Sequence, residues 1–147
     1  MEKHTHSVKS TEDVLRAGGF RATKSRRALL RLLEKAGTPL SIQQIAFTWG
    51  KTAPNITTLY RSLTDLNSAG IVRRIDLNTG TAHFEYSPSR PHHHHIVCND
   101  CGKVEELEYC AVGGLEKKLQ QTSKYFKDIY SHNLEFFGRC VACTHNS

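Results

Sequence analysis

The feature that most constrains the fold is the stretch 92–102, in which four consecutive histidines run into two cysteines. Those cysteines, Cys98 and Cys101, are separated by two residues, and Cys140 and Cys143 repeat the spacing further along the chain. Each Cys-x-x-Cys pair places two thiolates on one tight turn, and two pairs make the closed four-thiolate set typical of tetrahedral Zn²⁺. The sequence therefore predicts a structural zinc site, with a helix and a strand folded between the pairs. The alternative, two reduced thiol pairs that bind no metal, stays open.

Length and composition limit the kind of protein. A chain of 147 residues can form one domain or two small ones, and a small lobe often needs a structural metal for stability. No apolar run approaches the roughly 18 residues of a membrane span, and residues 1–10 lack the apolar region of a signal peptide. We therefore expect a cytoplasmic protein without membrane association, whose cysteines bind metal rather than form disulfides. The fifth cysteine, Cys110, is unpaired and is expected to be a small core residue, with a ligand role as the alternative.

The histidine run is expected to serve two different sites. In a strand, successive side chains point to opposite faces, so His93 and His95 share one face. His92 and His94 then share the other face. A polar strand that binds no ion is the alternative for both faces.

Other metal-binding side chains can complete each face. Glu85 and Glu106 can join the first pair of histidines, and imidazole with carboxylate suits Fe(II), Zn(II), Mn(II) or Co(II). His132 can join the second pair.

The charge of the chain is unevenly distributed. Residues 1–90 contain 14 Lys and Arg against 7 Asp and Glu, whereas residues 91–147 contain 6 against 7. A basic first half joined to a neutral half rich in His and Cys suggests a polyanion-binding lobe coupled to a metal-binding lobe. Basic helices that are simply solvated are the alternative.

The basic half has the pattern of a winged helix-turn-helix. Caps, helical spacing of apolar residues and Gly or Pro stops predict four helices, and two alternating runs around a turn predict a hairpin. These elements are expected near residues 10–18, 24–35, 41–47, 55–69, and 71–77 with 82–86. The start of the fourth helix carries side chains that can contact phosphates or base edges in a major groove, namely Asn55, Thr57, Thr58, Tyr60 and Arg61.

Two prolines in a polar segment predict a hinge at residues 88–91. We therefore expect a DNA-binding domain at 1–87 and a metal-binding domain at 92–147. In the second domain we expect a strand at 103–108, a helix at 110–121 and a strand within 126–137.

Taken together, these motifs resemble those of the ferric uptake regulator (Fur) family, the metal-dependent transcriptional repressors of bacteria. The resemblance covers about residues 10–143. It rests on the closing Cys-x-x-Cys and on Gly-Phe-Arg-Ala-Thr (19–23), Thr-Leu-Tyr-Arg-Ser-Leu (58–63), Ala-Gly-Ile-Val (69–72) and the histidine and cysteine run (92–104).

The resemblance implies an α+β fold with an N-terminal winged-helix lobe and a small C-terminal α/β lobe that forms a homodimer. Tyr60 and Arg61 would meet double-stranded DNA at an AT-rich palindrome, and Arg21 would reach the minor groove. The implied metal ligands fall into three sets: a structural zinc site at Cys98, Cys101, Cys140 and Cys143, a regulatory site at Glu85, His93, His95 and Glu106, and an accessory site at His92, His94 and His132.

The sequence departs from the family pattern at two sites. Pro39 stands where iron sensors usually add a histidine ligand, and His83 could substitute for it because it shares the strand face of Glu85. Gly113 stands where the accessory site usually has a carboxylate, so either Glu108 or Glu116 completes that site or the site is incomplete.

We therefore expect a metal-responsive repressor without catalytic turnover that controls metal homeostasis. It would carry structural Zn²⁺ and a regulatory Fe(II), Zn(II) or Mn(II) ion. Glutamate at position 85 favours Fe(II), because peroxide-sensing relatives place aspartate there and zinc-sensing relatives often use cysteine nearby. Zinc sensing and peroxide sensing remain the alternatives within the family. A redox-switched four-cysteine zinc chaperone is the alternative from another class, but it would leave the basic helical lobe without a role. A metallohydrolase would need a motif such as His-Glu-x-x-His, which the sequence lacks.

Overall fold

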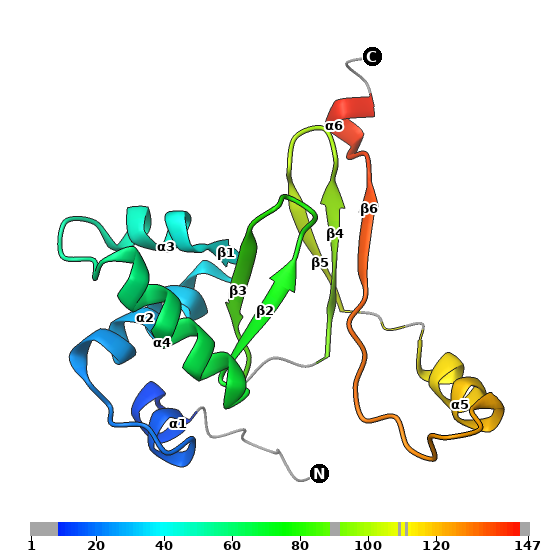
Figure 1. Cartoon of the computed structure of the whole chain (residues 1–147). Helices are drawn as coiled ribbons and strands as arrows, with labels where there is room; N and C mark the ends of the chain where they lie inside the picture. The colour runs from blue at the N-terminus through cyan, green and yellow to red at the C-terminus, as the bar shows by residue number, and fades with distance from the viewer. Residues whose placement is uncertain (1–8, 89–91, 109, 111, 145–147) are drawn as a thin grey trace, which may run out of the picture. The chain divides into compact units, whose positions relative to one another are not determined.

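A computed structural model describes residues 9–88, 92–108, 110 and 112–144, and it divides the chain into two compact units, Met1–Arg90 and Pro91–Ser147. The first unit is mainly helical, and the second is built around a small sheet (Figure 1). Residues 89–91 of the predicted hinge lie outside the described residues. The domain boundaries therefore stay a prediction.

The first unit begins with four helices, each capped by the side chain of the residue before it. Ser10, Thr23, Ser41 and Asn55 each accept a hydrogen bond from the backbone N–H three residues later, which satisfies a donor that has no partner within the helix. The prediction of four helices is confirmed, although the third ends two residues later than expected. Their bounds are α1 Thr11–Ala17, α2 Lys24–Ala36, α3 Ile42–Trp49 and α4 Ile56–Ser68.

A three-stranded antiparallel sheet completes this unit, in the order β1-β3-β2. β2 (Val72–Asp76) and β3 (Ala82–Tyr86) form the predicted hairpin. β1 (Leu40–Ser41) was not predicted, because two residues are too few to show an alternating pattern.

The core of the first unit comes from the apolar faces of its helices and the inner face of the hairpin. Leucines of α2 and α4 are among the most deeply buried side chains, and none of these six is more than 2% exposed: Leu29, Leu30, Leu33, Leu59, Leu63 and Leu66. Because α4 buries its leucines on one side, its other side is left for solvent or a partner.

The second unit contains a mixed sheet in the order β5-β4-β6. β4 (His94–Cys98) pairs antiparallel with β5 (Val104–Leu107) and parallel with β6 (Glu135–Gly138). Two helices, α5 (Gly113–Thr122) and α6 (Val141–Thr144), lie outside the sheet. The expected helix at 110–121 is wrong at its start, because α5 begins at Gly113 and leaves Cys110 outside the helix.

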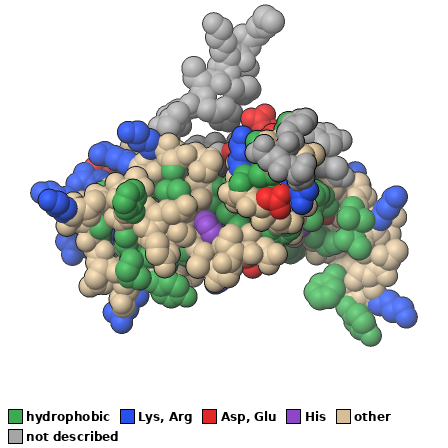
Figure 2. All heavy atoms as spheres, turned by 90° about the horizontal axis from the view of Figure 1, so that it is seen from above, with side chains coloured by type: hydrophobic (Ala, Val, Ile, Leu, Met, Phe, Trp, Pro, Cys, Tyr) green, Lys and Arg blue, Asp and Glu red, His purple; other side chains and the backbone are tan. Residues whose placement is uncertain are grey.

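The second unit buries little apolar surface by itself. Among its described residues, Val97 and Cys98 are the buried hydrophobic ones. Large apolar side chains are exposed on and after α5 and on β6: Leu115, Leu119, Tyr125, Phe126, Tyr130, Phe136 and Phe137. Figure 2 shows hydrophobic side chains, in green, on the surface at the right of the view. Within the described part of the chain, no helix combines the length and apolar character needed to cross a membrane.

Candidate metal centres and DNA-binding surface

The four cysteines of the two Cys-x-x-Cys pairs come together in the second unit. Their sulfur atoms all lie within 4.8 Å of one another, and the Cys101 and Cys140 sulfurs are 3.7 Å apart. Four sulfurs placed about 2.3 Å from a central zinc ion would be about 3.8 Å apart in a tetrahedron. The geometry therefore fits a closed four-thiolate site.

Strand direction explains why the two pairs meet. β4 and β6 run parallel, so their carboxyl ends lie side by side, with Cys98 opposite Gly138. Each strand then continues directly into its own Cys-x-x-Cys turn. The Asn99 N–H donates to the Gly138 carbonyl oxygen at 2.8 Å, which fastens one turn to the end of the other strand.

Hydrogen bonds give these thiols different pKa values. Backbone N–H groups of Cys140 and Cys101 lower the pKa of Cys98 to about 6, because they stabilise its thiolate. Hydrogen bonds with the neighbouring thiols, Cys140 first, raise the pKa of Cys143 to about 12. Four thiolates in one cluster repel one another, and a bound cation is what allows all of them to ionise.

The alternation predicted for the histidine run is confirmed. His93 and His95 share one face, with ring centroids 5.0 Å apart, and both side chains are at most 3% exposed. His92 and His94 share the other face, with ring centroids 4.7 Å apart. The run therefore contributes to two separate clusters.

Two carboxylates of the second unit accompany the first face. Glu106 Oε1 lies 3.9 Å from His93 Nδ1. Glu135 Oε2 lies 3.1 Å from His95 Nδ1 and accepts the His95 backbone N–H at the same distance. A carboxylate that faces Nδ1 keeps the proton on that nitrogen, so Nε2 of His95 presents the lone pair that a metal requires.

Glu135 was not predicted as part of any site. It lies directly opposite His95 in the parallel pairing of β4 and β6, a relation that spans 40 residues of sequence. The only available signal was a glutamate at the edge of an expected strand, and sequence spacing does not reveal which strands pair.

Two further predicted ligands, Glu85 and His83, belong to the first unit. Glu85 lies on β3 opposite Arg73, whose Nε is 3.9 Å from Glu85 Oε1. His83 Nδ1 lies 3.1 Å from the Thr81 carbonyl oxygen, and burial lowers the pKa of His83, which favours a neutral imidazole. The participation of both residues in the regulatory site stays a prediction.

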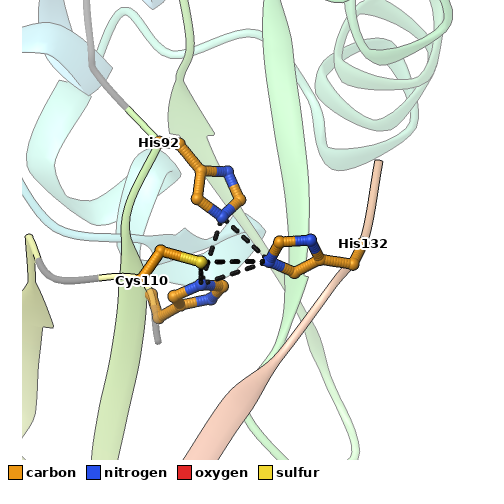
Figure 3. A group of neighbouring side chains, drawn as sticks. His92, Cys110 and His132 are labelled. Carbon is orange, nitrogen blue, oxygen red and sulfur yellow. Dashed lines mark hydrogen bonds between the residues drawn. The ribbon is translucent and has the colours of Figure 1, made fainter. Parts of the chain in front are cut away.

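The second face of the histidine run points into a cluster that includes Cys110 (Figure 3). The Nε2 atom of His92 is 2.9 Å from that of His132 and 3.1 Å from that of His94. The Cys110 sulfur is 3.2 Å from His94 Nε2 and 3.5 Å from His132 Nε2. Three imidazoles and one thiol therefore converge on one point.

This arrangement differs from the expectation that Glu108 or Glu116 completes the accessory set. Glu116 lies behind the cluster, with Oε1 2.5 Å from His132 Nδ1, and Cys110 takes the fourth corner. The structure places the half-buried Cys110 beside His94 and His132, so the choice between a small core residue and a ligand depends on this cluster.

The surface predicted to contact DNA lies at the start of α4. The Asn55 side chain caps this helix, with its Oδ1 accepting the Thr58 N–H at 2.8 Å. Tyr60 is 51% exposed, and Thr57 and Arg61 are also exposed. Arg21 is exposed in the segment between α1 and α2. Figure 2 shows further Lys and Arg side chains on the surface of the helical unit, at the left of the view.

Comparison with known proteins shows which family combines such metal-binding clusters with a winged-helix lobe. A sequence model described as the ferric uptake regulator family matches residues 17–137. The chain belongs to the ferric uptake regulator family. The peroxide-responsive repressor PerR of Staphylococcus aureus is 28% identical to it over 145 residues, which are 97% of this chain and 95% of that protein.

Solved structures of Fur proteins show the same fold. The ferric uptake regulator of Vibrio cholerae has a TM-score of 0.69 at 28% identity, covering 88% of this chain and 98% of that one. The ferric uptake regulator of Francisella tularensis, solved with iron, has a TM-score of 0.67 at 28% identity, covering 86% and 96%. These likenesses confirm the predicted α+β class, a winged-helix lobe with a smaller α/β dimerisation lobe.

Membership settles the general activity of the chain. Fur-family proteins are dimeric, metal-responsive, DNA-binding regulators rather than enzymes, and this Fur-family chain is a metal-dependent transcriptional repressor. The three clusters and the exposed end of α4 contain the candidate residues for metal binding and DNA binding.

Substitutions on α4 are expected to separate DNA binding from metal binding in this Fur-family chain. Tyr60→Ala and Arg61→Ala should each weaken binding to a cognate DNA site about tenfold or more, because a contact to a base edge contributes about 1–3 kcal/mol. Zinc content should be unchanged. Fluorescence anisotropy titrations and elemental analysis measure the two quantities. Arg16→Ala, on α1, is the control for loss of one positive charge, and undiminished DNA binding by both α4 variants would contradict the assignment.

Asn55 is expected to stabilise the folded protein by capping α4, independently of any contact with DNA. Asn55→Ala should lower the free energy of unfolding by about 1 kcal/mol, because the Thr58 N–H loses its acceptor. Asn55→Asp keeps an acceptor and should unfold like the parent, although its negative charge should weaken DNA binding. Urea denaturation followed by circular dichroism measures the difference, and equal stability of Asn55→Ala and the parent chain would rule out the capping role.

Proposed function

We propose that this chain is an Fe(II)-sensing repressor of metal homeostasis genes that acts in the cytoplasm as a homodimer on AT-rich palindromic DNA. In this proposal, Cys98, Cys101, Cys140 and Cys143 hold a structural zinc ion. The regulatory ion is held by Glu85, His93, His95 and Glu106, and His83 is the candidate to replace the ligand that Pro39 cannot supply.

The positions of the cysteines are the observation that favours Fe(II) as the regulatory metal. The chain has five cysteines, and each lies in either the four-cysteine cluster or the cluster of His92, His94 and His132. No thiol is left for the face of His93 and His95, whose neighbours in the second unit are carboxylates. Nitrogen and oxygen ligands suit Fe(II) and Mn(II), whereas a zinc sensor gains selectivity from thiolate.

Dimerisation is supported by the surface of the second unit. A small lobe that exposes large aromatic and aliphatic side chains, among them Tyr125, Tyr130 and Phe136, has unsatisfied apolar surface that a second copy can cover. β6 also forms one edge of its sheet. A two-fold symmetric dimer would match a palindromic DNA site, because the symmetry of the protein imposes equal half-sites.

Metal activation follows from differential affinity. If the DNA-competent arrangement of the protein binds the regulatory ion about 100-fold more tightly than other arrangements, the ion stabilises that arrangement by roughly 2.7 kcal/mol. A ligand set drawn from both units would supply this difference. Glu85 lies in the first unit, whereas His93, His95 and Glu106 lie in the second.

Peroxide sensing is the second candidate, and the likeness to the peroxide-responsive repressor PerR favours it. Position 85 argues against it, because peroxide-sensing members have aspartate there and this chain has glutamate. The two candidates differ in one observable. A peroxide sensor loses DNA affinity when the iron-loaded protein meets substoichiometric peroxide, whereas an iron sensor keeps it.

One titration tests the proposal. Double-stranded DNA is first selected from a random-sequence pool with the Mn(II)-loaded protein, and its binding is then titrated anaerobically against Fe(II), Mn(II) and Zn(II). We expect selection of an AT-rich palindrome. We also expect Fe(II) to stimulate binding to this DNA at the free Fe(II) concentrations of reducing cells. Stimulation by Zn(II) alone, or DNA binding that no metal changes, would overturn the assignment.

A further inference from the structure

The cluster around Cys110 has the dimensions of a metal site. In a tetrahedral zinc site, two ligating nitrogens are about 3.3 Å apart, and a nitrogen and a sulfur are about 3.6 Å apart. The three pairs of Nε2 atoms are separated by 2.9, 3.1 and 3.3 Å. The Cys110 sulfur is 3.2 and 3.5 Å from two of them. The four atoms therefore need to move by only a few tenths of an ångström to surround an ion.

The protons on two of the imidazoles strengthen this interpretation. His94 Nδ1 lies 2.9 Å from the Leu134 carbonyl oxygen, and His132 Nδ1 lies 2.5 Å from Glu116 Oε1. Both oxygens accept hydrogen bonds, so each Nδ1 is placed as a donor, and in the tautomer that this favours the lone pair lies on Nε2. Those two Nε2 atoms are 3.3 Å apart. Two lone pairs directed at the same point repel each other unless a cation lies between them.

We propose that Cys110 is a thiolate ligand that completes a closed site for Zn²⁺ with His92, His94 and His132. On binding, the Cys110 thiol loses its proton to solvent and the sulfur binds the metal as thiolate. Leu134 and Glu116 orient the two imidazoles, as carbonyl and carboxylate groups commonly do behind metal-bound histidine. No position is left open for water or substrate, which is the property of a structural site.

The Cys110 thiolate determines which metal ion this cluster prefers. Sulfur is a soft ligand that favours Zn(II) over Fe(II) and Mn(II), and four protein ligands favour tetrahedral coordination over octahedral. The accessory set of this chain thus differs in kind from the histidine and carboxylate face around His93 and His95. One strand would carry a zinc site on one face and the regulatory site on the other.

The ion would also hold α5 in place. Cys110 comes before this helix, Glu116 lies within it, and His132 comes from the segment after it. A metal bound by Cys110, His132 and the histidines of β4 connects both flanks of α5 to the sheet. Removal of the ion should therefore loosen the apolar surface that α5 carries.

The decisive measurement is zinc stoichiometry in full-length protein that lacks the regulatory site. In a His93→Ala/His95→Ala background, the chain should retain two zinc ions after gel filtration, one in each thiolate site. Adding Cys110→Ala should reduce this to one, and adding Cys110→Asp, which restores an anionic ligand, should bring binding back. A small core residue would behave differently: Cys110→Ala would then keep both ions, and that result would overturn the proposal.

Cobalt gives a readout that does not depend on metal affinity. Co(II) added to protein whose four-cysteine site already holds zinc should produce a sulfur-to-cobalt charge-transfer absorption, and the Cys110→Asp variant should bind Co(II) without it. Glu116→Gln should weaken zinc binding by about 10- to 100-fold, because the support of His132 is lost. A Co(II) spectrum identical in the parent and in Cys110→Asp would also refute thiolate ligation.

A second measurement avoids substitution of Cys110 altogether. In the zinc-loaded parent protein, peptide mapping after treatment with an alkylating reagent should find Cys110 protected, and His92→Ala/His132→Ala should expose it. Cys98 should stay protected in both proteins and serves as the internal control. Equal alkylation of Cys110 with and without zinc would count against the site. These outcomes do not involve DNA, so they are independent of whether the chain senses iron.

Discussion

Cys98→Ser is expected to abolish the fold of the second unit. This unit buries little apolar surface of its own, and its two Cys-x-x-Cys turns are joined by the cluster at the ends of β4 and β6. Binding of a structural zinc ion contributes about 10–16 kcal/mol in small zinc domains, which exceeds the stability that such a lobe can supply without it. Loss of one thiolate should therefore give a monomeric protein with an unfolded second unit and a folded first unit.

Amide hydrogen exchange and analytical ultracentrifugation measure this outcome. Peptides from residues 92–144 should lose protection in Cys98→Ser, whereas peptides from α2 and α4 should keep it. Cys110→Ser is the matched control, because it also removes one thiol but not one from the four-cysteine cluster. Any loss of protection in this variant should be confined to α5 and its flanks, while β4 and β6 stay protected. A folded, dimeric Cys98→Ser protein that contains no zinc would contradict the structural role of the ion.

His93→Ala/His95→Ala is expected to abolish metal-stimulated DNA binding while the protein stays folded. The two imidazoles are the nitrogen ligands of the proposed regulatory site, and removing both leaves carboxylates alone. The stimulation estimated above at about 100-fold should then disappear. The four-cysteine cluster shares no residue with this face, so its zinc ion should remain.

Titration of DNA affinity against added metal distinguishes the regulatory face from the other one. We expect Cys110→Ala to keep most of the metal response, because it acts on the opposite face of the run. Glu85→Gln should weaken the response if an ion joins the two units, and His83→Ala should weaken it only if His83 replaces the ligand missing at Pro39. An intact response in His93→Ala/His95→Ala would show that metal is sensed elsewhere.

The sequence was sufficient wherever local chemistry decides the structure. Helix caps such as Ser41 and Asn55 fix where a helix starts, and the period of two in the histidine run fixes which rings share a face. The spacing of the cysteines was enough to group the four thiols. In each of these cases, the interacting residues are close in sequence or belong to a recurring motif.

The sequence was insufficient where distant segments meet. Glu135 reaches His95 only because β4 and β6 pair in parallel, and that pairing has no signature in spacing. The proximity of Cys110 to His94 and His132 was not predicted, because sequence spacing does not show which of these segments meet. Glu116 was one of two candidate ligands for the accessory site, although a carboxylate one turn into α5 can support His132 from behind as readily as it can bind metal.

The parallel pairing of β4 and β6 has a consequence for how the protein matures. In that pairing Cys98 lies opposite Gly138 and His95 opposite Glu135. A slip of one residue would turn every side chain of β4 to the opposite face and exchange the two pairs of histidines. Zinc at the four cysteines excludes such a slip, because it joins the ends of both strands. In a newly synthesised chain, the four cysteines should therefore bind zinc first. Only then are the two faces of the histidine run fixed, so that each can select its own metal.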